Sequence, residues 1–447
     1  MSDAPNDLRR TLTEAADAVR HRRPANGQAA ALLHALGYAA DDGEESADQL
    51  AHRARMLDAA ALLTRFFRLA VPDAPGLAVF GGEIDPASIA PWWTGPRVSV
   101  SGTGVAPRPA FEACIGEAVE FLSGLQHAGD PVPHTRASIE AAGVDAATAT
   151  LVRALLGGCG QPEDTPIDWA AARRLSDGTV MLLPADICYR RDPACRTIVP
   201  PGPQSVGCAA GATFGAAVLH ALLELAERDA AALWWRGGRP GRALPLEHPA
   251  LGSAAELLRA LRQDRTSRRS WLLDITTDLG IPSIAAVSFA EDAHGFCCGT
   301  AARTTLEAAC HAALREMCQM ELAHHVVLAK QRERGDAALN EVDRHHVRRF
   351  TEIDAATCRL VQPLPPVGDS VPETGTDDLL VLVDRFVRLG LQPCVIDQTR
   401  TELGIPVARV LCPGLEQEPS TLQGERLRAV ISDTGGELRY GNGVPLM

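Results

Sequence analysis

The sequence predicts an α/β fold, and three observations carry this prediction. The first 70 residues hold helical patterns and lack strand-like runs. After about residue 72, short runs rich in Val, Ile and Leu appear, bounded by Gly, Pro and Asp. Alanine-rich helical segments alternate with these runs, which is typical of an α/β domain. We therefore expect a helical N-terminal extension at residues 1–70 and a larger α/β domain at residues 71–447.

The N-terminal extension is expected to consist of three helices. Their sequences are DLRRTLTEAADAVRHRR, GQAAALLHALGY and ADQLAHRARMLDAAALLTRFFRL, the last of which ends at Leu69. No residue pattern in them points to catalysis. The extension is interpreted as a docking element.

Eight runs predict the strands of the larger domain. They are GLAVFGG, RVSVSGTG, TVMLLPADI, SWLLDITTD, SIAAVSF, GFCCGTAA, QPCVIDQT and PVARVLCPG. Helices are expected at 111–124, 213–235, 252–264, 304–332 and 377–390. Residues 129–176 suggest a helical and loop excursion, and residues 364–376 a Pro-rich loop.

The helix at 213–235 is apolar on almost every side, which is typical of a buried helix. Glu224 and Glu227 lie three residues apart on it and therefore share a face. Buried carboxylates are costly unless they are paired, hydrogen-bonded or bound to a cation. A salt bridge between Glu224 and Arg228, four residues apart, would explain the glutamates without any function. We favour a functional acidic stripe, because a solvated pair would not need apolar neighbours.

The same spacing recurs on two further Ala-rich helices. Glu117 and Glu120 lie in FEACIGEAVEFLSG, and Glu316 and Gln319 lie in TTLEAACHAALREMCQMELAHH. The latter helix is expected to begin with a capping box at Thr304 and Glu307. Three such helices could converge their polar faces on one cavity.

Charge and composition exclude several classes of function. The 43 Lys and Arg residues against 56 Asp and Glu residues give a net charge of −13, which argues against non-specific nucleic-acid binding. No apolar run approaches the length of a transmembrane span. The N-terminus, MSDAPNDLRRTLTEAAD, lacks the apolar stretch of a signal peptide. The chain is expected to be cytoplasmic.

Two further patterns have structural explanations that we prefer. Twelve cysteines occur without any C-x-x-C spacing, so most are expected to be small core residues, although Cys188 or Cys195 could be a nucleophile. Gly102-Thr103-Gly104 could cradle a phosphate, but a plain strand–helix turn is the commoner use of such a sequence. The chain has neither G-x-x-x-x-G-K-[ST] nor G-x-G-x-x-G.

The sequence GCAAGATFGAAVLHALLELAERDAAALWW, with GEAVEFLSG before it and AALREMCQ after it, resembles the YcaO family. The segments LLDITTDLGIPSIAAVS and IPVARVLCPGLEQ are similar to that family as well. The resemblance covers roughly residues 65–447. It implies a YcaO-like ATP-binding catalytic domain of mixed β-sheets packed with helices. It also implies ATP- and Mg²⁺-dependent cyclodehydration of Cys, Ser or Thr in a ribosomally made precursor peptide, which gives thiazolines or oxazolines.

The resemblance assigns roles to seven residues. Glu117, Glu120, Glu224 and Glu227 would hold Mg²⁺ on the ATP phosphates. Arg228 would contact phosphate, and Glu316 and Gln319 would complete the nucleotide pocket. Catalytic side chains are not assigned, because phosphoryl transfer needs positioning and charge neutralisation more than a protein nucleophile. A separate peptide-presenting partner related to ubiquitin-activating enzymes is implied, together with a possible flavin dehydrogenase that oxidises azolines to azoles.

The sequence departs from the family pattern at three places. Ala209, Ala212 and Ala216 stand where many members carry Ser, Asn and Glu, although some peptide cyclodehydratases also have A-G-A-T there. Phe121 stands where an Arg often follows the first E-x-x-E. The chain ends in GNGVPLM rather than in the Pro-x-Pro-x-Pro tail of many azoline-forming members.

Three alternatives stay open. Sister members of the family install thioamides instead of azolines. A non-catalytic member could bind a peptide or partner as a scaffold. A carboxylate-bridged di-iron protein would use repeated E-x-x-H motifs on a helix bundle, of which Glu321–His324 is the one example here.

Overall fold

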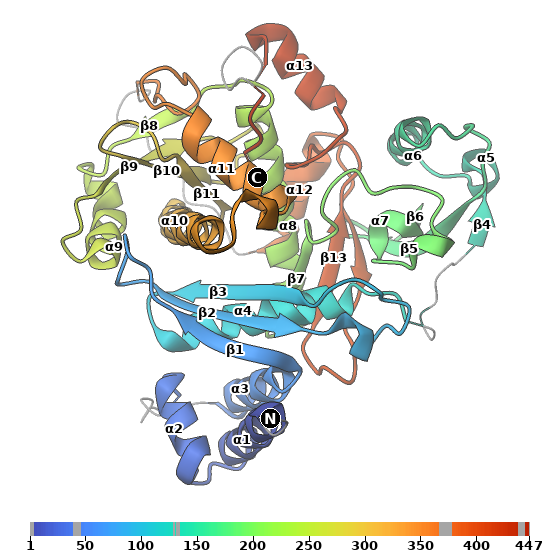
Figure 1. Cartoon of the computed structure of the whole chain (residues 1–447). Coiled ribbons are helices and arrows are strands. Elements are labelled where there is room, and N and C mark those ends of the chain that lie inside the picture. Colours follow the sequence, from blue (N-terminus) through green and yellow to red (C-terminus); the bar gives the residue numbers. More distant parts are fainter. Residues whose placement is uncertain are drawn as a thin grey trace.

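The computed structural model describes residues 4–38, 46–127, 130, 135–365, 378–436 and 443–446. Within these ranges the chain forms three β-sheets covered by helices, so the predicted α/β class is confirmed (Figure 1). Every pair of neighbouring strands in these sheets is antiparallel.

The first sheet has the order β1-β2-β3 and the second the order β11-β10-β9-β8. The third has the order β4-β5-β12-β13-β7, with β6 paired to β5. The strands are β1 (Leu63–Leu69), β2 (Ala78–Ile84), β3 (Val98–Gly104), β4 (Thr135–Ala137), β5 (Ile167–Arg174), β6 (Val180–Pro184), β7 (Cys208–Ala210), β8 (Arg242–Leu244), β9 (Arg268–Asp274), β10 (Ser283–Ala290), β11 (Cys297–Ala302), β12 (Cys394–Asp397) and β13 (Val407–Leu411).

The predicted helices of the larger domain are confirmed to within a few residues. The helices are α1 (Ala4–Arg20), α2 (Gly27–Ala35), α3 (Ala47–Ala60), α4 (Pro107–Ser123), α5 (Ile139–Ala142), α6 (Ala146–Gly158), α7 (Ala185–Cys188), α8 (Phe214–Trp235), α9 (Gly252–Arg262), α10 (Leu306–Arg334), α11 (Glu341–Glu352), α12 (Leu379–Arg388) and α13 (Glu425–Thr434). The Pro-rich loop at 364–376 lies almost entirely outside the described residues, and of the C-terminal GNGVPLM the residues 443–446 are described.

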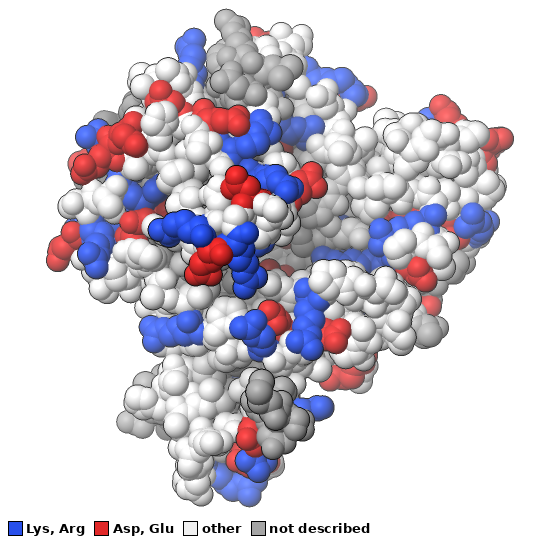
Figure 2. All heavy atoms as spheres, in the orientation of Figure 1, with Lys and Arg blue, Asp and Glu red and all other residues white. Residues whose placement is uncertain are grey.

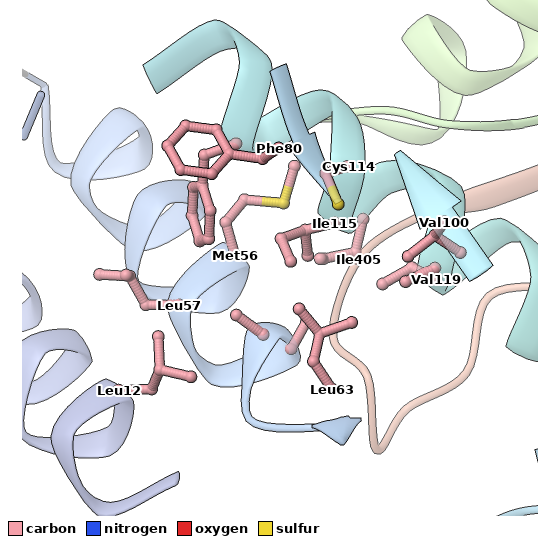
Figure 3. Packing of buried hydrophobic residues seen from close by; sticks show 14 of the residues in the cluster. Leu12, Met56, Leu57, Leu63, Phe80, Val100, Cys114, Ile115, Val119 and Ile405 are labelled. Carbon is pink, nitrogen blue, oxygen red and sulfur yellow. The ribbon is translucent and has the colours of Figure 1, made fainter. Parts of the chain in front are cut away.

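The helices α1 to α3 pack beneath the first sheet at one end of the molecule (Figure 1). Figure 3 shows the core that joins them to it, where Leu12 and Leu57 face the side chains of Phe80 and Ile115. Leu57 is completely buried in this cluster. The extension is therefore fastened to the sheet by an apolar core. The domain division at residue 70 stays a proposal.

The prediction of helix up to Leu69 is wrong for the last nine residues. Helix α3 ends at Ala60, and Leu63–Leu69 forms β1, which pairs with β2. Aromatic and β-branched residues favour strands, and here alternate residues face the sheet's buried side. The predicted excursion at 129–176 likewise contains the strands β4 and β5 besides α5 and α6.

Three strand–helix units position the polar faces of α4, α8 and α10. Strand β3 leads into α4, β7 into α8 and β11 into α10. At or just after each strand a glycine touches the backbone of the following helix. A Cβ atom on Gly102, Gly211 or Gly299 would lie 2.1 to 2.5 Å from a backbone nitrogen of that helix. These glycines let each helix pack directly on its strand.

The starts of two of these helices are fixed by threonine caps. The hydroxyl of Thr213 accepts a hydrogen bond from the amide of Ala216 at the start of α8. Thr305 caps α10 through the amide of Ala308. The capping box predicted at Thr304 and Glu307 is therefore wrong, because the N-cap is Thr305 and the residue three positions later, Ala308, has no side chain that could complete a box. In the part of the chain that the structure describes, no helix has the length and apolar character needed to cross a bilayer.

Candidate functional site

Helix α8 is buried along most of its length, as predicted, and places its two carboxylates at the start of β7 and on β11. The Oε2 atom of Glu224 accepts a hydrogen bond from the amide of Gly207 at 3.0 Å. Glu227 accepts one from the Thr300 hydroxyl at 2.9 Å and one from the amide of Ala302 at 3.3 Å. The Arg228 guanidinium lies 3.5 Å from Glu224 and 3.7 Å from Glu227. The salt bridge considered from the sequence is thus present as a long contact within a larger cluster.

Helix α4 contributes the second acidic pair. Glu117 Oε2 accepts a hydrogen bond from the amide of Ser101 on β3 at 2.7 Å. Glu120 Oε1 accepts one from the amide of Ala210 on β7 at 2.8 Å. The two carboxylates of one helix therefore contact two different sheets.

Helix α10 contributes the third pair. Glu316 Oε2 accepts a hydrogen bond from the amide of Thr300 on β11 at 3.1 Å. The Nε2 atom of Gln319 donates one to the hydroxyl of Ser101 on β3 at 3.0 Å. Ser101 is thus shared between α4 and α10, and Thr300 between α8 and α10.

Together these contacts form a closed ring of three helices and three strands. On each helix the first polar residue binds at the strand that precedes that helix. The second polar residue of each helix contacts the strand of the next strand–helix unit. These contacts run from α4 to β7, from α8 to β11 and from α10 back to β3. All seven residues predicted for the site lie in this ring or contact it. Ser101 and Thr300 were not predicted, because strand residues with one hydroxyl carry no motif.

The carboxylates of the ring differ in how far solvent reaches them. Glu117 is exposed, Glu120, Glu224 and Glu316 are partly buried, and Glu227 is buried. In Figure 2 the face shown is hollowed between the layer of β1–β3 and the body above it, and Lys and Arg side chains stand around the hollow. Basic groups at a rim favour the approach of an anionic ligand.

Burial controls the protonation of these groups. It raises the pKa of Glu120 to about 8, and the protein around the carboxylate raises the pKa of the more exposed Glu117 as well. Burial and the neighbouring Glu227 raise the pKa of Glu316 to about 8, and burial raises the pKa of Glu224. Burial alone would lower the pKa of Arg228, but the two carboxylates of α8 raise it. Without a cation, several of these carboxyl groups are therefore protonated at neutral pH, and a bound cation would favour their ionised form.

The donor set of the ring fits Mg²⁺ that is shared with phosphates. Carboxylate oxygens are hard ligands, and Mg²⁺ is usually held by one or two of them together with phosphate oxygens and water. One oxygen each of Glu117, Glu120 and Glu316 accepts an amide hydrogen bond, and the other accepts none from a described residue. Among the described residues, no three His, Cys, Asp or Glu side chains come close enough to hold a metal alone. Phosphate oxygens would thus have to complete the coordination.

These raised pKa values make the stability of the metal-free protein depend on pH. Glu120 and Glu316 keep their protons in the folded state up to about pH 8, whereas in the unfolded chain they lose them near pH 4.5. Between these values the folded protein binds more protons than the unfolded chain, so its stability falls as the pH rises. We expect the melting temperature in EDTA to fall between pH 6.8 and pH 8.2. The free energy of unfolding should fall by up to about 1.4 kcal/mol per pH unit for each of the two groups.

The matched control is the variant Glu120→Gln/Glu316→Gln, in which neither group can titrate. Its melting temperature is expected to change less than that of the wild type over the same range. Equal pH slopes for the two proteins would contradict the assignment of raised pKa values to this ring.

Glu321 lies on α10 outside the ring and is not available to a metal. The Arg262 guanidinium donates to both of its carboxylate oxygens at 2.6 and 2.8 Å, and Arg268 lies 3.1 Å away. Arg262 and Arg268 belong to the basic stretch RQDRTSRRS at residues 262–270. Its arginines neutralise a buried glutamate, and a di-iron site at Glu321–His324 is not supported.

We expect Glu321→Ala to lower the free energy of unfolding by about 3–5 kcal/mol, because it leaves two largely buried guanidinium groups without their carboxylate. Chemical denaturation measures this loss. The matched control is Glu352→Ala, which breaks the exposed Arg348–Glu352 pair and should cost less than about 1 kcal/mol. Similar losses in the two variants would contradict the structural role of Glu321.

Other candidates from the sequence lie away from the ring or are closed. Gly102-Thr103-Gly104 belongs to β3, and the backbone of α4 occupies the space beside Gly102, so this turn cannot cradle a phosphate there. Cys188 is buried, and burial raises the pKa of its thiol to about 12. A protonated, buried thiol is a poor nucleophile. All twelve cysteines are free, and Cys195 is the exposed one.

A family model described as YcaO cyclodehydratase, ATP- and Mg²⁺-binding, matches residues 101–416. A curated relative from Rhizobium leguminosarum bv. trifolii, an uncharacterized protein in the tfuA 3′ region, is 27% identical over 271 residues. That match spans 57% of this chain and 62% of the relative.

Three solved structures share the fold. A heterocyclase in complex with substrate and cofactor superposes with a TM-score of 0.63 at 23% identity, over 84% of this chain and 52% of that chain. YcaO from Methanopyrus kandleri, bound with AMPPCP and Mg²⁺, superposes with a TM-score of 0.53 at 19% sequence identity. The match covers 81% of this chain and 88% of that chain. A chain of the E. coli microcin synthetase McbBCD complex superposes with a TM-score of 0.57 at 14% sequence identity. The match covers 78% of this chain and 87% of that chain. The chain thus spans about half the length of that heterocyclase and 62% of its curated relative.

Proposed function

The chain belongs to the YcaO family, whose members are described as ATP- and Mg²⁺-binding, and from this premise we propose that it is a peptide cyclodehydratase. The proposed substrate is a ribosomally made precursor peptide. Its Cys, Ser or Thr residues become thiazolines or oxazolines. The single observation that carries the proposal is the ring of three helices, because it gathers five carboxylates and one arginine in a partly desolvated site.

In this proposal the acidic pairs of α4 and α8 hold the metal. Glu117, Glu120, Glu224 and Glu227 would be its ligands, and when bound Mg²⁺ would bridge and neutralise the ATP phosphates. Arg228 would donate to a phosphate oxygen. The hydrogen bonds from strand amides keep the carboxylate planes fixed, so that little reorganisation is needed when the nucleotide binds.

Glu316 and Gln319 would complete the nucleotide pocket from α10. Their contacts to Thr300 and Ser101 support this role, because these contacts hold α10 against the other two helices. The absence of a catalytic triad from the ring suits a reaction in which the peptide supplies the nucleophile.

The proposed reaction closes a ring on the peptide and removes the carbonyl oxygen as phosphate. The side-chain thiol or hydroxyl of the peptide attacks the preceding backbone carbonyl carbon and forms a ring with a tetrahedral centre. The oxygen of that centre attacks the γ-phosphorus of ATP and releases ADP. Loss of inorganic phosphate, with loss of the amide proton, leaves the C=N bond of the azoline. The peptide thereby loses one water, whose oxygen leaves with phosphate.

A separate partner is proposed to present the peptide. The heterocyclase with bound substrate is about twice as long as the part this chain matches, and the microcin synthetase is a complex of several proteins. We propose a peptide-presenting protein related to ubiquitin-activating enzymes, and a flavin dehydrogenase where azoles are the final products. Efficient modification by the purified chain alone would contradict the need for such a partner.

Intact-mass analysis of a candidate precursor peptide tests the function. The peptide is incubated with the chain, the proteins encoded beside it, ATP and Mg²⁺. Loss of one water per modified residue is the expected result. Exchange of oxygen for sulfur in the presence of a sulfide source would replace the cyclodehydratase by a thioamide-forming enzyme. No mass change and no ATP turnover would favour a non-catalytic scaffold, for which Ala209, Ala212 and Ala216 are the residues of interest.

A further inference from the structure

Arg190 is held beside the acidic pair of α4 by an unusual backbone anchor. Its amide donates to the carbonyl of Gly124 at 2.7 Å, and its carbonyl accepts from the amide of Gln126 at 2.8 Å. Gly124 ends α4, four residues after Glu120. The loop that carries Arg190 is therefore attached on both sides to the end of the helix that supplies half of the predicted metal ligands.

The side chain of Arg190 is positioned as firmly as its backbone. Its guanidinium carbon lies 4.3 Å from the centroid of the Phe121 ring, over its face. The edge of Trp93 packs against the same ring with centroids 5.7 Å apart. A Cβ atom on Gly124 would lie 2.5 Å from the Nη1 atom of Arg190, so that only glycine leaves room for the guanidinium there.

The Arg190 guanidinium forms no ion pair and no side-chain hydrogen bond with a residue of the described ranges. Glu120 is near enough to act on its charge without forming a salt bridge. The next residue, Arg191, is by contrast paired with both Asp168 and Asp186. Burial lowers the pKa of Arg190 to about 10, which still leaves the guanidinium charged at neutral pH. A fixed, largely enclosed cation without a salt bridge to a described residue indicates a ligand that brings negative charge.

We infer that Arg190 binds a phosphate group of the nucleotide in the ring of α4, α8 and α10. The inference rests on the proposed function and adds to it a residue that no motif assigns. A planar guanidinium presents paired donors that match two oxygens of one phosphate. Phe121 provides the flat surface that fixes the plane of this group. Arg190 then stands on the α4 side of the site, as Arg228 stands on the α8 side.

The test compares AMPPCP with inorganic tripolyphosphate, both with Mg²⁺, by calorimetry on the full chain. We expect Arg190→Gln to weaken both ligands by similar factors of about tenfold to hundredfold, the loss of a charge-assisted hydrogen bond. Gly124→Ala, which displaces the guanidinium but keeps its charge, should weaken both in the same direction. Arg173→Gln on the exposed face of β5 is the matched control and should change neither.

Two outcomes would overturn the inference, and a third would overturn the proposed function on which it rests. Unchanged affinities in Arg190→Gln would show that the guanidinium does not touch the ligand. A loss for AMPPCP without a loss for tripolyphosphate would place Arg190 at the adenosine instead. A wild-type chain that binds neither ligand would overturn the proposed function, whereas binding by the wild type with an unaffected variant would overturn this inference alone.

Discussion

Replacing Glu224 and Glu227 together by Gln is expected to abolish ATP-dependent modification of the peptide. A catalytic metal contributes several kcal/mol to a phosphoryl-transfer transition state, and each loss of about 1.4 kcal/mol is tenfold in rate. We therefore expect the rate to fall by about 10³-fold or more. Glutamine keeps an oxygen that can accept the hydrogen bonds from Gly207 and Thr300, so the fold should persist.

The measurement is ATP turnover together with the intact mass of the peptide. Glu256→Gln on the exposed side of α9 is the matched control, because it removes one carboxylate far from the ring. It should leave both readouts unchanged. A double variant with more than about a tenth of wild-type activity and an unchanged melting temperature would exclude these two residues as metal ligands.

Substituting Gly299 by Ala is expected to cause a large loss of stability for the addition of a single methyl group. The new Cβ atom would lie 2.2 Å from the backbone nitrogen of Met317, which cannot move without the whole of α10. Overpacking of this kind costs about 3 kcal/mol. The shift of α10 should also lengthen the hydrogen bond from Thr300 to Glu316 and weaken nucleotide binding.

The matched control is Gly116→Ala on α4, where a Cβ atom would meet nothing within 4 Å. Alanine is the better helix former by about 0.5–1 kcal/mol, so this variant should be slightly more stable than the wild type. Chemical denaturation of both variants decides the matter. Equal stabilities would contradict the close strand–helix contact at Gly299.

The buried central helix and the convergence of three polar faces could be predicted from the sequence. Leucines and alanines fill most positions around Glu224 and Glu227 on this helix, which leaves these carboxylates as enclosed polar groups that need partners. The repeated spacing on α4 and α10 then implied one shared site. The partners themselves could not be predicted, because the amides of Gly207 and Ala210 lie on strands that only the tertiary fold brings to the helices.

Other parts of the molecule depended on distant contacts. The strand β1 follows α3 without a Gly or Pro to mark the boundary, so its sequence continued the helical pattern. The arginines at 262 and 268 looked solvated until Glu321 was found beside them, 59 residues after the first. Arg190 carries no motif, and its position follows from Phe121 and Gly124, which approach it only in the folded chain.

Binding of AMPPCP to the purified chain, with Mg²⁺ or with EDTA, tests the central claim most directly. The ring of α4, α8 and α10 supplies carboxylates that need a cation before they can approach phosphates. Binding is therefore expected in Mg²⁺, and it should be lost in EDTA and in Glu224→Gln/Glu227→Gln. Glu256→Gln should bind like the wild type. Binding of equal strength in EDTA, or in the double variant, would contradict a metal-bridged nucleotide site in this ring.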